Sequence, residues 1–273
     1  MCQAVFGGCH GDPFSPLRRV KYQLLAGFSC DDVDMSGLTD QEMIQELRNF
    51  DTATICNVVA TYPHSDICLR LYDAWWGEYY TDSSLRCIYP ELGPVCGYAA
   101  TAWYSEESPH YTKLDRWALP EHLDGTPKPV VLVAKQTYPP GLERLAGLFG
   151  GNMTAQFKAL GVAGVVTDGP MRDYVEIREM GVQYLASGLT SGHGPLQLRG
   201  ADIPIKVAGM SVKPGDIVHM DHCGACTFPA GKLPKVLEYA RELRRREAES
   251  QAVFKDPRFS LERWKGTARE RGY

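Results

Sequence analysis

The stretch that decides the fold is Gly164-Val165-Val166-Thr167-Asp168-Gly169-Pro170-Met171-Arg172-Asp173. Its apolar beginning continues Val162-Ala163 and predicts a buried strand, which the Asp-Gly-Pro turn ends. An earlier β-branched run at 129–134 predicts a second buried strand. Spaced apolar residues over 145–160 predict one helix between the strands, and this helix would contain Gly150-Gly151. Strand, helix and strand in this order form a right-handed βαβ unit, so the sequence predicts an α/β protein.

The composition excludes several classes of protein. The chain has 273 residues, of which 44% are hydrophobic and 23% charged, so it can bury a core without crosslinks. A net charge of -4 argues against nucleic-acid binding through bulk charge. The 9 cysteines lack the close spacing of a disulfide scaffold and predict reduced thiols in a cytoplasmic protein. We expect no secretory signal at Met1–Gly8 and no membrane partner, because no apolar run approaches the roughly 18 residues of a membrane span.

Three regions are expected along the chain. Residues 1–38 are rich in Gly, Cys and Asp without periodicity and predict an irregular extension. Residues 39–250 form the main domain. Residues 251–273 form a polar tail, with Phe259, Leu261 and Trp264 as anchors onto a neighbouring surface.

Helix signals mark both ends of the main domain. Thr39-Asp40-Gln41-Glu42 has the spacing of a capping box, and Asp51 or Thr52 caps a second helix. A last helix has an apolar face over 233–243 and a run of arginines at its end. Cations favour a helix C-terminus, so we interpret that run as structural rather than as RNA-binding. Shorter strands are expected at 182–186, 205–208 and 216–220.

Aromatic residues crowd the segment from Cys68 to Asp124, as in Trp75-Trp76 and Trp103-Tyr104. They predict either a stacking surface for bases or sugars, or the filling of a core or subunit interface. The second interpretation is favoured because the interleaved Lys and Arg of a nucleic-acid platform are sparse.

The Arg172-Asp173 pair is the main candidate for chemistry. It follows a buried strand by a few residues, and ligands gather beyond the carboxyl ends of strands in α/β sheets. A guanidinium holds a carboxylate by two parallel hydrogen bonds, and a carboxylate offers a hard oxygen to Mg²⁺ or Mn²⁺. The alternative is a surface pair that caps a helix starting at Tyr174.

Two further groups of residues are candidates for chemistry. His193 lies between glycines in the loop 187–195 and is either a general acid–base or substrate contact, or a solvated loop histidine. His219 and His222 lie just before a Cys-x-x-Cys at Cys223 and Cys226. Because no second ligand pair has matching spacing, packing around a strand is favoured there over a zinc site.

These motifs resemble those of a known family. Gly151-Asn152-Met153, the stretch from Gly161 to Asp173, and Val212-Lys213-Pro214-Gly215-Asp216 with Asp221 and Gly224 are similar to the class II pyruvate aldolases of the 4-hydroxy-4-methyl-2-oxoglutarate aldolase group. The same superfamily includes the regulator of ribonuclease activity A. The resemblance covers roughly residues 40–245, so 39–250 is the expected catalytic domain.

The resemblance implies an α/β fold with a β-sandwich-like core related to swivelling domains and flanked by helices. It also implies a homotrimer or hexamer with sites between subunits. Asp173 would bind Mg²⁺, Mn²⁺ or another divalent metal, Arg172 would bind the oxo-acid, and the amides of Gly150-Gly151-Asn152-Met153 would receive the pyruvyl group. The metal would stabilise the enolate left by carbon–carbon cleavage.

One departure concerns the reaction. Members of this group place an aspartate twenty-one positions before the arginine, where it orients a metal-bound water, and this chain has Gly151 there. Decarboxylation of oxaloacetate needs the same enolate with fewer proton transfers, so it is an alternative to aldol cleavage. Two other hypotheses are a specialised enzyme with an unfamiliar substrate and a noncatalytic regulator that binds a ribonuclease or helicase.

Overall fold

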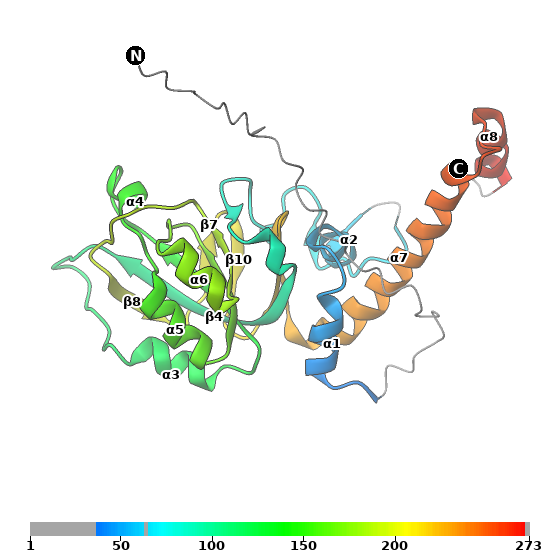
Figure 1. Cartoon of the computed structure of the whole chain (residues 1–273). Coiled ribbons are helices and arrows are strands. Elements are labelled where there is room, and N and C mark those ends of the chain that lie inside the picture. Colours follow the sequence, from blue (N-terminus) through cyan, green and yellow to red (C-terminus); the bar gives the residue numbers. More distant parts are fainter. Residues whose placement is uncertain (1–36, 63–64, 271–273) are drawn as a thin grey trace, which may run out of the picture. The chain divides into compact units, whose positions relative to one another are not determined.

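The computed structural model describes residues 37–62 and 65–270, with side chains as far as Gly266. The expected extension at 1–38 therefore lies almost entirely outside the described residues. The fold is mixed α/β, with a nearly closed, barrel-like sheet flanked by helices (Figure 1), which confirms the predicted class. The sheet contains β3 (Arg86–Cys87), β4 (Val95–Ser105), β5 (Val130–Gln136), β6 (Val162–Thr167), β7 (Gln183–Ala186), β8 (Gln197–Ala201), β11 (Ile217–Asp221) and β12 (Gly224–Phe228).

The strands follow the order β12-β11-β4-β5-β6-β7-β3, and β8 pairs with the second half of β4. The strands β4, β5, β6 and β7 are parallel, so the predicted βαβ unit is present. In β5, Leu132 packs on the helix-covered side and Val131 on the side of the hairpin β9 (Ile205–Val207) and β10 (Met210–Val212). Burial of both faces explains why β5 has no polar alternation.

The helix expected over 145–160 is wrong in its beginning. The chain forms α4 (Leu142–Leu145), then an extended segment, then α5 (Gly151–Ala159) with Gly150 as its N-cap residue. A Gly pair is unfavourable inside a helix, and the buried Leu148 and Phe149 pack in the extended segment instead. Gly161 ends the α5 region with a φ of 88°, as predicted. The pair Gly150-Gly151 therefore starts a helix rather than lying within one.

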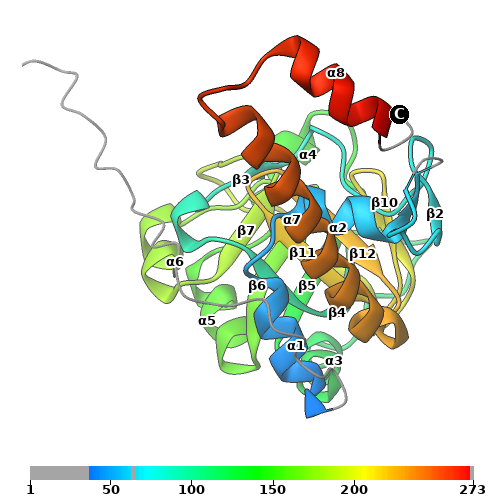
Figure 2. The same cartoon turned by 90° about the vertical axis from the view of Figure 1, so that its right-hand side faces the viewer.

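Helices α5 and α6 (Tyr174–Met180) lie side by side on one face of the sheet (Figure 1), and α3 (Ala118–Gly125) contacts β4 and β8. On another face, α7 (Leu233–Lys255) contacts α1 (Asp40–Leu47) and α2 (Thr52–Val59), as Figure 2 shows. The capping box of Thr39 and Glu42 is present, and Asp51 caps α2 by accepting a hydrogen bond from the Thr54 N–H at 2.6 Å. Both predicted helix starts are confirmed.

The end of the chain is more helical than expected. α7 runs through the boundary predicted at 250 and 251, and α8 (Leu261–Glu270) follows it. Phe259 and Trp264 contact Phe254 of α7, so two of the expected anchors pack within the end of the chain itself. Arg241 and Arg246 form ion pairs with Glu46 and Asp66.

The aromatic-rich segment contains the longest strand, β4, which the sequence analysis did not predict. Tyr79, Tyr89 and Tyr104 are buried, as expected for a core, but the Trp75 and Trp76 side chains are 65% and 87% exposed. The remaining short elements are β1 (Ala60–Thr61), β2 (Tyr72–Asp73) and the 3-10 turns at Pro90–Leu92 and Ala230–Lys232. The cysteines of the described residues are free thiols. Over those residues, we find no helix that combines the length and the apolar character needed to cross a bilayer.

Candidate functional site

The site is built at the carboxyl ends of β5 and β6. These strands run in parallel and their last paired residues are Ala134 and Thr167. Just beyond, Asp168 Oδ1 accepts a hydrogen bond from the Gln136 N–H at 2.7 Å, which ties the two strand ends together. Burial raises the pKa of Asp168 to about 6. Asp168 therefore fixes the start of the loop that carries Arg172 and Asp173.

Three loops lie side by side at this edge. Met171 is buried and forms backbone bridges with Phe149 and Leu189, and a third bridge joins Gly147 to His193. The Arg172 N–H donates to the Phe149 carbonyl at 3.0 Å. The predicted segment at 150–153, the Arg-Asp pair and the His193 loop are thus brought to one edge of the sheet.

Asp173 is held in an uncommon conformation. Its φ of 60° and ψ of 44° are left-handed, which is rare for a residue with a side chain and recurs at functional sites. Its Oδ2 accepts a hydrogen bond from the Gly151 N–H at 2.9 Å, and Arg172 Nε lies 3.3 Å from both carboxylate oxygens. The Gly151 N–H and then the Arg172 guanidinium lower the pKa of Asp173, which therefore remains an anion.

The two glycines of α5 make this arrangement possible. A Cβ at position 150 would lie 2.5 Å from Asp173 Oδ2 and 3.1 Å from Arg172 Cγ. A Cβ at position 151 would lie 2.2 Å from the carboxyl carbon of Glu176. The backbone at Gly150-Gly151 is therefore open on the side where the carboxylates of Asp173 and Glu176 lie. We call this pair of glycines the glycine cradle.

The other predicted binding residues are placed as follows. The Gly151 amide, expected to receive a substrate oxygen, donates to Asp173 in this structure. Asn152 is exposed, whereas Met153 is half-buried and packs against the core. His193 is exposed, with Nδ1 3.3 Å from the Gly194 carbonyl oxygen. Their roles toward substrate stay predictions, and the alternative that Asp173 precedes a helix is also realised, since it is the N-cap residue of α6.

The Asp221-His222-Cys223 group forms the turn between β11 and β12. Each residue offers one possible metal-ligand atom, all within 4.8 Å of one another. However, Asp221 is buried, and its two oxygens accept hydrogen bonds from the backbone N–H groups of Thr52 and Cys223. The bond from Thr52 joins the hairpin to the start of α2, and the bond from Cys223 closes the turn, which agrees with the packing interpretation of this region.

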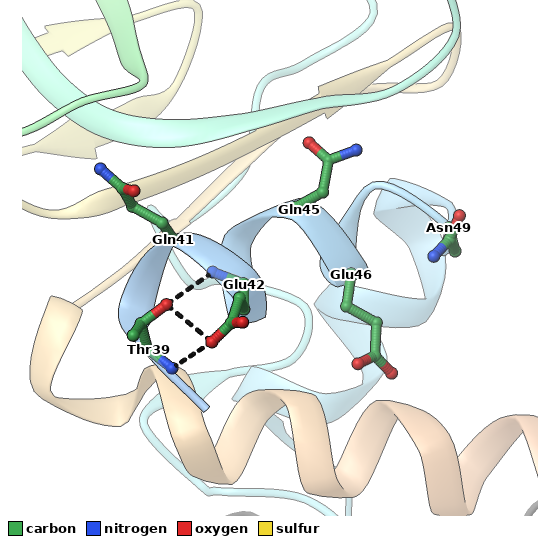
Figure 3. Close-up of a pocket in the computed structure, with 6 residues that line it drawn as sticks. All are labelled: Thr39, Gln41, Glu42, Gln45, Glu46 and Asn49. Carbon is green, nitrogen blue, oxygen red and sulfur yellow. Dashed lines mark hydrogen bonds between the residues drawn. The ribbon is translucent and has the colours of Figure 1, made fainter. Parts of the chain in front are cut away.

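A shallow, solvent-open hollow lies on α1 (Figure 3). Its lining residues are Thr39, Gln41, Glu42, Gln45, Glu46 and Asn49. The Thr39–Glu42 contacts in it belong to the capping box, and Glu46 pairs with Arg241 of α7. The hollow shares no residue with the Arg172–Asp173 edge and is explained by helix structure.

The residues at that edge fit a hard divalent cation. Asp173 is an ionised carboxylate whose side chain is 32% exposed, so a cation can reach it from solvent. A Cβ at position 150 would lie only 2.5 Å from its Oδ2 atom, so the glycine there leaves room for the carboxylate in this position. Mg²⁺ is typically bound by one or two carboxylates with water completing its shell, which this donor set matches.

Together, the parallel βαβ core and the Arg-Asp pair at its carboxyl edge define an α/β protein with a candidate site formed by loops. The sequence model described as Aldolase/RraA matches residues 52–226, and the chain belongs to this RraA-like family.

Curated relatives are similar over part of their length. A 4-hydroxy-4-methyl-2-oxoglutarate aldolase of Thermus thermophilus is 36% identical over 83 residues, which are 30% of this chain and 51% of that protein. An uncharacterized protein of Methanocaldococcus jannaschii is 31% identical over 101 residues, or 37% of this chain and 49% of that protein. The chain thus spans about half the length of the curated relatives it matches.

Solved structures share the fold. Streptomyces coelicolor RraAS2, described as an unusual member of the RNase ES inhibitor RraA protein family, gives a TM-score of 0.59 at 24% identity, covering 78% of this chain and 97% of that one. A structure described under novel cellulases from gut-associated microbes gives 0.61 at 22% identity, covering 78% and 88%. At these identities the likeness supports the fold alone.

Proposed function

We propose that this protein is a divalent-metal-dependent lyase that cleaves a 4-hydroxy-2-oxo acid, or decarboxylates oxaloacetate, to yield pyruvate. The observation that carries the proposal is Asp173, an ionised carboxylate fixed in a left-handed conformation over a glycine cradle. The aldolases among the curated relatives support it. Its natural location would be the cytoplasm. Its assembly would be a homotrimer or hexamer, and sedimentation of the full chain tests this oligomeric state.

Each residue of the site has a distinct task in this proposal. Asp173 would hold Mg²⁺ or Mn²⁺, which when bound supplies a Lewis acid for the negative charge of the enolate. Arg172 would hold the carboxylate of the oxo-acid through its guanidinium N–H groups. The Gly151 N–H keeps Asp173 oriented and anionic, so that the ligand need not reorganise when substrate binds.

The test is a pyruvate-release assay on a panel of 4-hydroxy-2-oxo acids and oxaloacetate, with EDTA or a divalent metal. We expect metal-dependent release by the wild type and its loss in Asp173→Ala. Glu179→Gln is the matched control, because Glu179 is an exposed acid of the same helix α6. Full activity in Asp173→Ala would contradict the proposal.

A noncatalytic regulator is the second candidate, since the family also contains RNase ES inhibitors. The position of Asp173 over the glycine cradle favours the enzyme, because a binding scaffold needs no carboxylate held by a left-handed backbone at this edge. A stable complex with a ribonuclease or helicase, together with no pyruvate release from any oxo-acid of the panel, would favour the regulator. Activity confined to an unrelated oxo-acid would indicate a specialised enzyme.

A further inference from the structure

Glu176 occupies a position that the proposed function has not used. Its carboxyl carbon and both oxygens lie within 2.4 Å of the point where a Cβ of residue 151 would be. A side chain at 151 would meet the end of the Glu176 side chain, which would have to move away. Glu176 belongs to the first turn of α6, and the space it fills belongs to the first turn of α5. The packing of these two helices therefore carries a second carboxylate to the glycine cradle.

The two carboxylates of the cradle differ in their surroundings. Asp173 Oδ2 accepts from the Gly151 N–H, and both of its oxygens face Arg172 Nε at 3.3 Å. Hydrogen bonds and a positive charge stabilise an anion and make it a weak proton acceptor. Asp173 is therefore poorly suited to moving protons.

Aldol cleavage and its completion require a group that moves a proton in both directions. Glu176 is exposed, on a longer side chain than that of Asp173, and it rests on the adjacent glycine. On the basis of the proposed lyase function, we infer that Glu176 is the general acid–base of the reaction. Its reach into the cradle depends on the absence of a side chain at Gly151.

The Glu176 carboxylate takes the proton of the C4 hydroxyl of a 4-hydroxy-2-oxo acid, directly or through one water. The C3–C4 bond breaks, its electron pair forms the enolate of pyruvate, and the carbonyl product leaves. Glu176 then returns the proton to C3, which yields pyruvate and restores the carboxylate. No oxidant or reductant is required.

His193 is another side chain of this edge with acid–base chemistry. Its loop bridges Gly147, three positions before the cradle, and its Nδ1 faces the Gly194 carbonyl. Glu176, in contrast, contacts the cradle itself. His193→Gln is therefore included in the test as a comparison.

The experiment measures pyruvate release, Mn²⁺ affinity by electron paramagnetic resonance and thermal unfolding on the full chain. Glu176→Gln keeps the size of the side chain and should lower kcat by about 100-fold or more, the usual contribution of a general acid–base. Its Mn²⁺ affinity and Tm should stay near those of the wild type. Glu179→Gln, on the same helix, should change none of the three.

A relocated carboxylate gives a sharper readout. Glu176→Ala vacates the space next to residue 151, and Gly151 has no left-handed φ that would bar a side chain. The double variant Gly151→Asp with Glu176→Ala should therefore have a kcat about tenfold or more above that of Glu176→Ala alone. A merely structural role for Glu176 would not give this recovery.

The outcomes separate the inference from the function on which it rests. If wild type releases no pyruvate from any oxo-acid, the proposed lyase function is wrong and the acid–base role falls with it. If wild type is active and Glu176→Gln keeps its kcat, or His193→Gln alone loses it, only the acid–base assignment is overturned. A loss of Mn²⁺ affinity in Glu176→Gln as large as in Asp173→Ala would make Glu176 a metal ligand and would also overturn it.

Discussion

Gly150→Ala is the substitution that tests the cradle most selectively. The new Cβ would lie 2.5 Å from Asp173 Oδ2 and 3.1 Å from Arg172 Cγ. Carbon and oxygen do not approach this closely without a bond, so the Asp173 carboxylate must move. Gly150 is an N-cap residue with a φ of -132°, which alanine can adopt. The substitution therefore displaces the proposed ligand without straining the backbone.

The expected effect follows from the hydrogen bond that the displaced carboxylate loses. Asp173 Oδ2 accepts from the Gly151 N–H at 2.9 Å. A hydrogen bond to a charged group contributes about 1.5–3 kcal/mol, and each 1.4 kcal/mol changes an equilibrium constant about tenfold. If the oriented carboxylate is the metal ligand, Mn²⁺ affinity should fall about 10- to 100-fold.

Mn²⁺ titration followed by electron paramagnetic resonance measures this affinity, and thermal unfolding reports the fold. Gly192→Ala is the matched control, because its Cβ would meet only the Leu145 carbonyl oxygen, at an ordinary 3.4 Å, in a loop of the same edge. We expect Gly192→Ala to bind Mn²⁺ like the wild type. Equal Mn²⁺ affinity in Gly150→Ala and Gly192→Ala would show that the position of the Asp173 carboxylate does not determine metal binding.

Three further predictions concern the site and its support. Arg172→Lys should raise the KM for the oxo-acid about tenfold with little change in Tm, because an ammonium cannot form the two parallel hydrogen bonds of a guanidinium; an unchanged KM in steady-state kinetics would argue against carboxylate binding there. The raised pKa of Asp168, about 6 against 3.8, means that the folded state binds its proton more tightly. The stability that this bound proton gives to the folded state is complete below pH 3.8 and is lost as the pH rises through about 6. The Tm of the wild type should therefore fall over this range, and Asp168→Asn, which keeps an acceptor for the Gln136 N–H, should flatten that dependence; equal slopes would contradict the assignment. Asp221→Ala leaves the buried Thr52 N–H without its acceptor and should cost about 2–3 kcal/mol in urea unfolding, whereas an unchanged midpoint would show that the bond is dispensable.

Local signals in the sequence predicted much of the fold. The uninterrupted apolar run at 129–134 and the stretch at 162–167 became β5 and β6 because both faces of these strands are buried. Thr39 and Asp51 predicted helix starts because capping depends on the nearest few residues.

Long-range pairing set what the sequence did not indicate. The strand β4 holds small and aromatic residues without a clear alternation, and its place depends on partners on both sides, β5 on one and β8 and β11 on the other. Likewise, the beginning of α5 depends on contacts of Phe149 with Met171, which lies far along the chain. Such contacts leave no periodic pattern.

The site shows the same division. Arg172 and Asp173 were predicted from their place after a buried strand, and the structure brings them to the start of α5 as expected for a carboxyl edge. Glu176 was not predicted. The signal available was Gly151 itself, since a glycine at a helix start can mark close approach of another group, but the identity of that group depends on how α6 packs on α5.

In the proposed enzyme, Asp173 is a metal ligand and pyruvate is a product. The most direct measurement is pyruvate release from the oxo-acid panel by the full chain, with Mg²⁺ or Mn²⁺ and with EDTA, alongside a folded Asp173→Asn variant. We predict release that requires the metal, ceases on chelation and is lost in Asp173→Asn. Pyruvate release that is unchanged by EDTA or by Asp173→Asn, or no release from any oxo-acid under any metal, would contradict it.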